Sequence, residues 1–225
     1  MMQKVWISLG CMMLFVLCLA ADLGEAQGYP ERFDVVIDVG HGGVDGGTSA
    51  HGLLEKDLNL EVGKKLYKRL MEEGYNVGIT RIHDYALSND SRLHIRSRHL
   101  RDLAQRKLIA ETLHPKLFIS LHMNWSNSRR ARGPLVIYQA SQKSYSLSQL
   151  LQQHLNDLYQ VEKKPIRGNA YFLMKHLHMP SVIVELGYLS NSRDLSMVAD
   201  KKFQERVAET LTHAIGEYFL LYPVE

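Results

Sequence analysis

The feature that most constrains the fold of this chain is the alternation, after residue 30, of apolar β-forming runs with longer amphipathic stretches. Several runs are continuously apolar, as in sheet strands that are buried on both faces. The order βαβαββαββα predicts a three-layer α/β/α domain with a twisted, mostly parallel sheet of about six strands. The expected strands are Phe33–Asp38, Tyr75–Thr80, Leu117–Leu121, Leu135–Tyr138, Tyr171–Met174 and Ser181–Glu185. The expected helices are Glu55–Glu73, Leu100–Leu113, Tyr145–Tyr159 and Phe203–Leu220.

The first 27 residues have the layout of a secretory leader. Lys4 precedes an apolar run from Val5 to Ala21, and small and polar residues follow as far as Gly28. This pattern is typical of a signal peptide, with cleavage expected before Gln27 or, alternatively, after Ala20. The run of about 17 residues is at the lower limit for spanning a bilayer, so an uncleaved N-terminal anchor stays open. We therefore expect an exported protein whose residues 28–225 form one catalytic domain.

Cysteine usage and charge narrow the chemistry. Both cysteines, Cys11 and Cys18, lie in the leader, so the mature chain has no disulfide or thiolate metal site. The formal net charge of +3 is too small to indicate nucleic-acid binding. Any metal ion must therefore be held by histidine, aspartate or glutamate.

Four polar residues occupy the places where an α/β sheet holds its reaction site. His41, His122 and Glu185 stand at the carboxyl ends of expected strands, and Glu55 begins the first expected helix after a glycine-rich loop. Two imidazoles and a carboxylate are a ligand set typical of catalytic zinc. A further carboxylate could take a proton from water and return it to a leaving amine.

Each of these residues also has a simpler interpretation. A single histidine is more often a hydrogen-bonded core residue than a ligand, and Glu55 alone would suit the positive end of a helix. The loop after the first strand could cradle a phosphate, but it has neither the GxGxxG spacing nor a GK[ST] ending. Two histidines and two acids at neighbouring strand ends favour the metal site, and Glu185 would be costly to bury without a partner.

Other residues near these four are candidates for supporting roles. Asp38, Asp45 and Asp57 lie close in sequence to the ligands and could orient an imidazole. His51 is expected to face solvent, with substrate contact as the alternative. The arginines of the segment 126–132 are expected in a solvated loop; the functional alternative is a rim that meets anionic wall polymers, stem-peptide carboxylates or a protein.

Five motifs resemble the zinc N-acetylmuramoyl-L-alanine amidases of the amidase 3 type. They are IDVGHGGVDGG at 37–47, LLEKDLNLEV at 53–62, TR at 80–81, SLHMN at 120–124 and VIVELGYLSN at 182–191. The resemblance implies that His41, Glu55 and His122 bind Zn²⁺ and that Glu185 is catalytic. It also implies hydrolysis of the amide that joins the lactyl group of N-acetylmuramic acid to the first L-alanine of the peptidoglycan stem.

The short chain, with a leader and no visible wall-binding module, is similar to the branch that processes spore cortex for germination. We expect peptidoglycan muropeptides as substrate, action in the cell wall or spore cortex, and room for a protein that activates or targets the enzyme. Two alternatives stay open because metal chemistry does not name the bond cut. One is a zinc peptidase or deacetylase that acts on another wall bond, and the other is a non-catalytic wall-binding activator.

Overall fold

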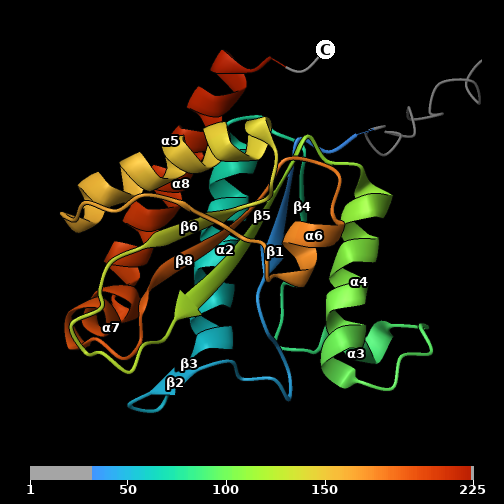
Figure 1. Ribbon diagram of the computed structural model, residues 1–225, viewed down its shortest axis with the longest axis horizontal. Helices are drawn as coiled ribbons and strands as arrows, with labels where there is room; N and C mark the ends of the chain where they lie inside the picture. The colour runs from blue at the N-terminus through green and yellow to red at the C-terminus, as the bar shows by residue number, and fades with distance from the viewer. Residues whose placement is uncertain (1–31, 224–225) are drawn as a thin grey trace, which may run out of the picture. The chain divides into compact units, whose positions relative to one another are not determined.

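The computed structural model describes residues 32–223, which form a six-stranded sheet covered by helices on both faces (Figure 1). The strand order is β4 (Val77–Ile79), β1 (Val35–Val39), β5 (Leu117–Asn124), β8 (Ser181–Tyr188), β6 (Leu135–Tyr138) and β7 (Ile166–Arg167). All neighbouring strands are parallel except β6 and β8, which are antiparallel. The expected three-layer fold with a mostly parallel sheet of about six strands is confirmed.

The two faces of the sheet have separate cores. Alternate residues of β1 enter each core, with Val35 and Ile37 in the larger and Val36 in the smaller, as the two-residue repeat of a strand requires. The helices α2 (Glu55–Glu72), α5 (Gln142–Tyr159) and α8 (Lys201–Leu221) supply the larger core, with α7 (Ser192–Ala199) beside α8. The helices α4 (Arg98–Leu113) and α6 (Phe172–His176) cover the other face, and α3 (Leu87–Asp90) packs beside α4.

One expected strand, Tyr171–Met174, is wrong. This segment forms the short helix α6, and the sixth strand is β7. Leu173 and Met174 of α6 are both buried in the smaller core, which is possible because adjacent side chains of a helix do not alternate between two opposite faces. A strand would have turned Leu173 and Met174 to opposite faces of the sheet.

A tight hairpin that the sequence pattern did not predict leads into α2. Its strands are β2 (Ser49–Ala50) and β3 (Leu53–Leu54), and the two residues between them, His51 and Gly52, both have positive φ. Positive φ at both central positions is the geometry of a two-residue hairpin turn. Because β3 ends at Leu54, the hairpin places Glu55 at the first residue of α2.

No helix within residues 32–223 is long and apolar enough to cross a membrane. The predicted signal peptide or anchor of residues 1–27 lies outside the described residues.

Candidate active site

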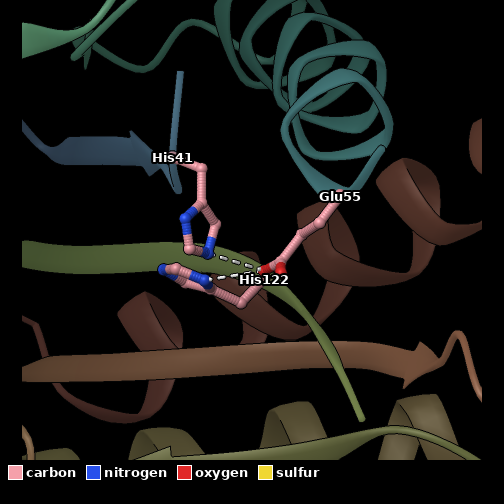
Figure 2. A group of neighbouring side chains, drawn as sticks. All are labelled: His41, Glu55 and His122. Atoms are coloured by element: carbon pink, nitrogen blue, oxygen red, sulfur yellow. Dashed lines mark hydrogen bonds and ion pairs between the residues drawn. The ribbon is translucent and has the colours of Figure 1, made fainter. Parts of the chain in front are cut away.

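The structure brings His41, Glu55 and His122 together at the carboxyl ends of β1 and β5 (Figure 2). Glu55 Oε1 lies 3.1 Å from His41 Nε2 and 3.0 Å from His122 Nδ1. One ligand atom from each of the three residues lies within 4.8 Å of the other two. Two imidazole nitrogens and a carboxylate oxygen that converge in this way are a donor set that suits Zn²⁺. The residues present therefore fit the metal that the resemblance implies.

Glu55 is buried and fully hydrogen-bonded. Besides the two imidazoles, its carboxylate accepts hydrogen bonds from the backbone N–H groups of Met123 at 3.0 Å and Thr48 at 2.8 Å. Burial acts to raise the pKa of Glu55, but the imidazoles of His122 and His41 outweigh it and hold this pKa well below its usual range. The carboxylate is therefore charged and fixed in position before any cation binds.

Two glycines let the backbone pass close to these side chains. A Cβ atom at residue 40 would lie 2.4 Å from the His122 ring, and one at residue 47 would lie 2.5 Å from Glu55 Oε2. Gly47 also has a φ of +66°, which favours glycine. The sequence left open whether this glycine-rich loop binds a phosphate. In the structure, its glycines leave room for the side chains of His122 and Glu55.

Asp45 contacts the other nitrogen of His41. Its Oδ2 lies 3.0 Å from His41 Nδ1, which is the arrangement that fixes the orientation of a metal-binding imidazole. Burial lowers the pKa of His41, but Glu55 and Asp45 raise it by more, so the net shift is upward. Of the three nearby aspartates, only Asp45 touches an imidazole within the described part of the chain. Asp57 is exposed on α2, and Asp38 is buried beneath the site.

Asp38 belongs to a buried network that holds the His41 loop from below. Arg106 Nη1 donates to Asp38 Oδ1 at 2.6 Å and to the Val39 carbonyl at 2.7 Å, while its Nη2 donates to the His41 carbonyl at 3.0 Å. Burial acts to raise the pKa of Asp38, but the Arg106 guanidinium and the Ser120 hydroxyl bring it below its ordinary value. These bonds stabilise His41 in a backbone conformation with φ of +60°, which is unusual for a residue other than glycine.

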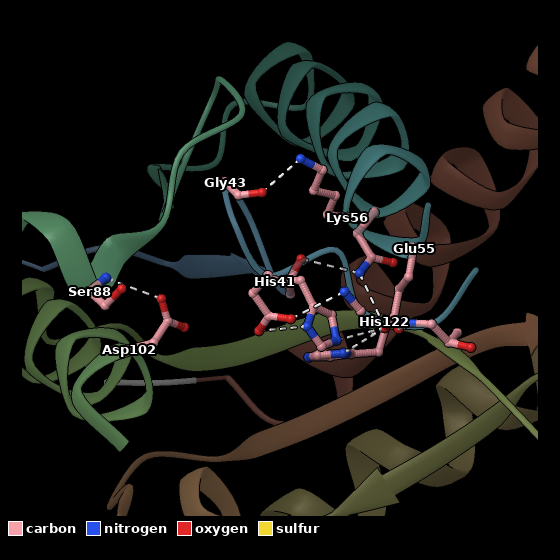
Figure 3. A network of polar contacts seen from close by, with 12 residues as sticks. His41, Gly43, Glu55, Lys56, Ser88, Asp102 and His122 are labelled. Carbon is pink, nitrogen blue, oxygen red and sulfur yellow. Dashed lines mark hydrogen bonds and ion pairs between the residues drawn. The ribbon is translucent and has the colours of Figure 1, made fainter. Parts of the chain in front are cut away.

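Further bonds connect the same loop to α2 and to the segment after β4. Arg81 donates to the carbonyls of Gly40 at 3.0 Å and of Lys56 at 2.7 Å. Figure 3 shows two outer contacts, from Lys56 Nζ to the Gly43 carbonyl at 2.8 Å and from the Ser88 N–H to Asp102 at 3.2 Å. Side chains from α2, from the segment after β4 and from α4 therefore all donate hydrogen bonds to the backbone of the His41 loop.

Two supporting residues in the site, Arg106 and Asn59, were missed by sequence reasoning. The side chain of Asn59 is buried and donates to the Gly40 carbonyl at 3.3 Å. Arg106 carried a usable signal, because it follows Leu103 by three residues and precedes Ala110 by four, on the stripe of α4 that faces the smaller core. A charged residue on a buried stripe indicates a buried partner.

Glu185 lies beside this cluster without joining it. It is opposite His122 in the pairing of β5 with β8, and it is 8 % exposed. Its Oε2 is buried and has no hydrogen-bond partner within residues 32–223. Burial raises the pKa of Glu185; His122 opposes the rise, and the charge of Glu55 adds to it. A β-bulge between His122 and Asn124 shifts the strand register here, as is common next to active sites.

The remaining sequence candidates stand away from the cluster. His51 is exposed at the hairpin turn, and Arg129, Arg130 and Arg132 are exposed in the loop between β5 and β6. The solvated interpretation of that loop agrees with their exposure.

Comparison with known proteins identifies the family. Residues 35–217 match the Amidase_3 family, described as N-acetylmuramoyl-L-alanine amidase, and this chain belongs to that family.

Individual relatives show how far the similarity extends. The chain is 30% identical over 187 residues to the germination-specific N-acetylmuramoyl-L-alanine amidase of Bacillus subtilis strain 168, a match that covers 82% of this chain and 79% of the relative. It is 29% identical over 222 residues to the uncharacterized protein YqiI of the same strain, covering 97% and 99% of the two chains. The CwlD amidase of Clostridioides difficile, solved in complex with the GerS lipoprotein, superposes with a TM-score of 0.78 at 27% identity, over 84% of this chain and 100% of that one. The family expected from the motifs is confirmed, as are the fold expected from the strand and helix pattern and the CwlD-like branch expected from the short chain with its leader.

Proposed function

We propose that this protein is a zinc-dependent hydrolase that cuts the amide between the lactyl group of N-acetylmuramic acid and the first L-alanine of the peptidoglycan stem. One observation carries the proposal. In a chain of the amidase family, His41, Glu55 and His122 converge on one point, and Glu185 lies on the neighbouring strand with a buried Oε2 that has no hydrogen-bond partner among residues 32–223.

His41, Glu55 and His122 would hold the zinc ion. When bound, zinc polarises a carbonyl and lowers the pKa of a water molecule to about 7. The contacts already described hold two of these ligands, His41 and Glu55, in position for this role. Asp45 orients the His41 ring, and the Met123 and Thr48 amides fix the Glu55 carboxylate.

Glu185 is the proton carrier in this proposal. Its free Oε2 accepts a proton from the attacking water and returns that proton to the nitrogen of the leaving L-alanine. The raised pKa suits both steps, because a carboxyl with a pKa closer to neutral is a better base than an ordinary one and can still act as an acid. Glu55 is unsuited to this work, since its oxygens are engaged and its pKa is lowered.

The place of action follows from the substrate and from the relatives. A muropeptide hydrolase works outside the cytoplasm, in the cell wall or the spore cortex, and residues 1–27 would serve as the export signal or anchor. The similarity to a germination-specific amidase supports the spore cortex. The solved complex of CwlD with a lipoprotein supports a protein partner for this chain as well.

The test is mass spectrometry of peptidoglycan fragments after incubation with the purified, zinc-loaded protein. We expect free stem peptides that begin with L-alanine, and glycan that keeps an intact lactyl group. Release of acetate would indicate a deacetylase, and cleavage inside the stem would indicate a peptidase. Unchanged fragments, together with binding to purified sacculi, would indicate a non-catalytic wall-binding protein.

A further inference from the structure

A cavity distinct from the reaction centre opens among three loops, and we call it the loop pocket. It has a volume of about 350 Å³, and its walls include His51 of the hairpin β2–β3, Trp125 of the loop after β5 and Leu189 of the loop after β8. The hairpin and the end of β5 lie at the same end of the sheet (Figure 1). Among the described residues that line the loop pocket, none belongs to the metal cluster and none is Glu185. The chemistry of the reaction centre therefore does not account for this cavity.

Trp125 is the largest apolar side chain in the lining. It is 50% exposed, and among the described residues that line the pocket it is the only large apolar side chain that is exposed. An exposed indole forgoes much of the hydrophobic free energy that an aromatic side chain gains when it buries about 150–250 Å² of surface. The free half of this indole, inside a concave surface, is therefore a place where a ligand with an apolar face can bind.

The rest of the lining is mainly polar and carries no negative charge. Asn127 and Arg129 follow Trp125 on the same loop, and Ser190 and His51 come from the other two loops. Arginine offers five N–H donors, and an asparagine amide or a serine hydroxyl offers both donors and acceptors. Among the described lining residues none is acidic. The loop pocket therefore suits a neutral or anionic ligand that has an apolar face and many hydroxyl or amide groups at its edge.

Hydrogen bonds hold the loop pocket in shape. The Ser126 N–H donates to Ser190 Oγ at 3.0 Å, and the Asn191 amide donates to the Arg129 carbonyl at 2.7 Å. The loop after β5 is thus fixed to the loop after β8 at two points, and the Arg129 guanidinium takes no part in these bonds. A pocket that is formed before its ligand arrives loses less conformational entropy on binding.

We propose that the loop pocket binds one sugar unit of a wall glycan strand, with the Trp125 indole against a face of the ring and Asn127 and Arg129 hydrogen-bonded to its edge. The faces of a pyranose ring carry C–H groups, whose weakly positive hydrogens pack on the negative face of an indole. Hydroxyl and acetamido groups surround the edge of the ring. The choice of wall glycan among saccharides rests on the proposed function. The site goes beyond that function, because it holds glycan whether or not the sugar carries a stem peptide.

A protein is a poorer match for this surface. The buried centre of a protein interface contains several apolar side chains in contact, whereas Trp125 is surrounded by polar side chains. The volume of the loop pocket instead lies near the lower end of the range of about 300–1,000 Å³ that is typical of sites for small ligands. One sugar unit is a ligand of that size class.

The experiment measures binding without catalysis, in zinc-loaded, full-length protein that carries Trp6→Phe. Trp6 is the only other tryptophan of the chain, so the indole emission of this protein comes from Trp125 alone. The probe is a tetramer of β-1,4-linked N-acetylglucosamine, which has the sugar linkage of wall glycan but no lactyl group and no stem. We expect the emission to shift to shorter wavelength and to saturate with a Kd on the order of 1 mM. A glucose tetramer of the same linkage should bind roughly fivefold more weakly, because it lacks the acetamido hydrogen bonds.

Variants then test the two side chains that carry the proposal, by NMR titration with the same tetramer. Trp125→Ala should weaken binding by about 10-fold or more, and Trp125→Tyr, which keeps an aromatic ring, should recover most of the affinity. Arg129→Gln should weaken binding by roughly fivefold. Arg130→Gln is the matched control, because it removes the charge of a neighbouring exposed arginine that is not part of the lining, and it should leave the affinity unchanged.

Three results would overturn the proposal: emission that responds to neither tetramer, equal affinities for the two tetramers, or an equal loss of affinity in Arg129→Gln and Arg130→Gln. Emission that responds to neither tetramer would favour a protein contact at Trp125 instead. Neither tetramer contains the amide of the proposed reaction, so these results leave the proposed function untouched. A protein that binds the N-acetylglucosamine tetramer but cuts no muropeptide would contradict the proposed function and leave the saccharide site standing.

Discussion

Glu55 and Glu185 are two buried carboxylates at the same end of the same sheet, and their surroundings differ in nearly every respect. Glu55 begins a helix and accepts hydrogen bonds from two backbone amides, with two imidazoles in contact. Glu185 lies within a strand, and its Oε2 has no partner within the described residues. Their pKa values move in opposite directions, downward for Glu55 and upward for Glu185. Saturation with hydrogen-bond partners makes one carboxylate a fixed anion, and isolation makes the other able to exchange a proton.

The largest expected effect comes from removing the charge of the isolated carboxylate. Glu185→Gln keeps the size of the side chain, so the variant should fold and keep one zinc per chain. Turnover should fall by roughly 10²- to 10⁴-fold, the usual contribution of a positioned acid or base. Steady-state kinetics with a soluble muropeptide and metal analysis of the same sample check both parts. Loss of zinc with the fold intact would make Glu185 a ligand, and near-normal turnover would make it a structural residue.

The matching change on the saturated carboxylate should act on the metal first. Glu55→Gln replaces one acceptor oxygen by an NH₂ group that faces imidazoles and amide donors. We expect zinc affinity to fall by about 100-fold or more, because changes in the groups that only orient ligands already cost about 10- to 100-fold. Competition with a chelator measures this affinity. An Asp57→Asn variant, which alters an exposed acid on the same turn of α2, serves as the control and should leave the affinity unchanged.

The smallest effect concerns stability without metal. The pKa of Glu185 is higher in the folded protein than in the unfolded chain, so the folded state binds this proton more tightly. The free energy of unfolding therefore falls as the pH rises from the ordinary pKa of a glutamate through the raised pKa of Glu185. Glu185→Gln removes this dependence. In metal-free protein at a pH above the raised pKa, the variant should be more stable than wild type by about 1–3 kcal/mol, which is the cost of an unpartnered buried group. At a pH below the ordinary pKa of a glutamate, the two proteins should be equally stable. Denaturant unfolding at several pH values checks the sign, and a wild type that gains stability relative to the variant as pH rises would contradict it.

The sequence predicted those parts of the molecule that depend on nearby residues. Continuous apolar runs predicted the strands β1, β5 and β8. Because parallel strands bring their carboxyl ends to one edge of the sheet, the polar residues at the ends of these runs predicted the cluster of site residues. The prediction of a strand at Tyr171–Met174 was wrong because a run of four apolar residues is too short to show whether its period is that of a strand or of a helix. The true sixth strand, β7, has two exposed residues and hence no apolar signal.

The contacts that support the ligands depended on tertiary structure. Asp38, Asp45 and Asp57 all lie close to the ligands in sequence, so the sequence could not tell which of them contacts an imidazole. The turn of the chain at His41 brings Asp45 into that contact. The contact of Arg106 with the His41 carbonyl joins residues 65 positions apart. The position of Arg106 on a buried stripe indicated that it needed a partner, but the identity of that partner depends on how α4 lies across β1.

The pairing of His122 with Glu185 across β5 and β8 limits how this site can change over evolutionary time. Neighbouring strands are about 4.8 Å apart whatever side chains they carry, so the spacing between these two groups is set by backbone hydrogen bonds. Substitutions in the covering helices can accumulate without altering that spacing. Sliding either strand by one residue, however, would turn its side chain to the opposite face of the sheet. Descendants of such a protein can therefore diversify their rims and partners far more readily than the separation of the two reacting groups.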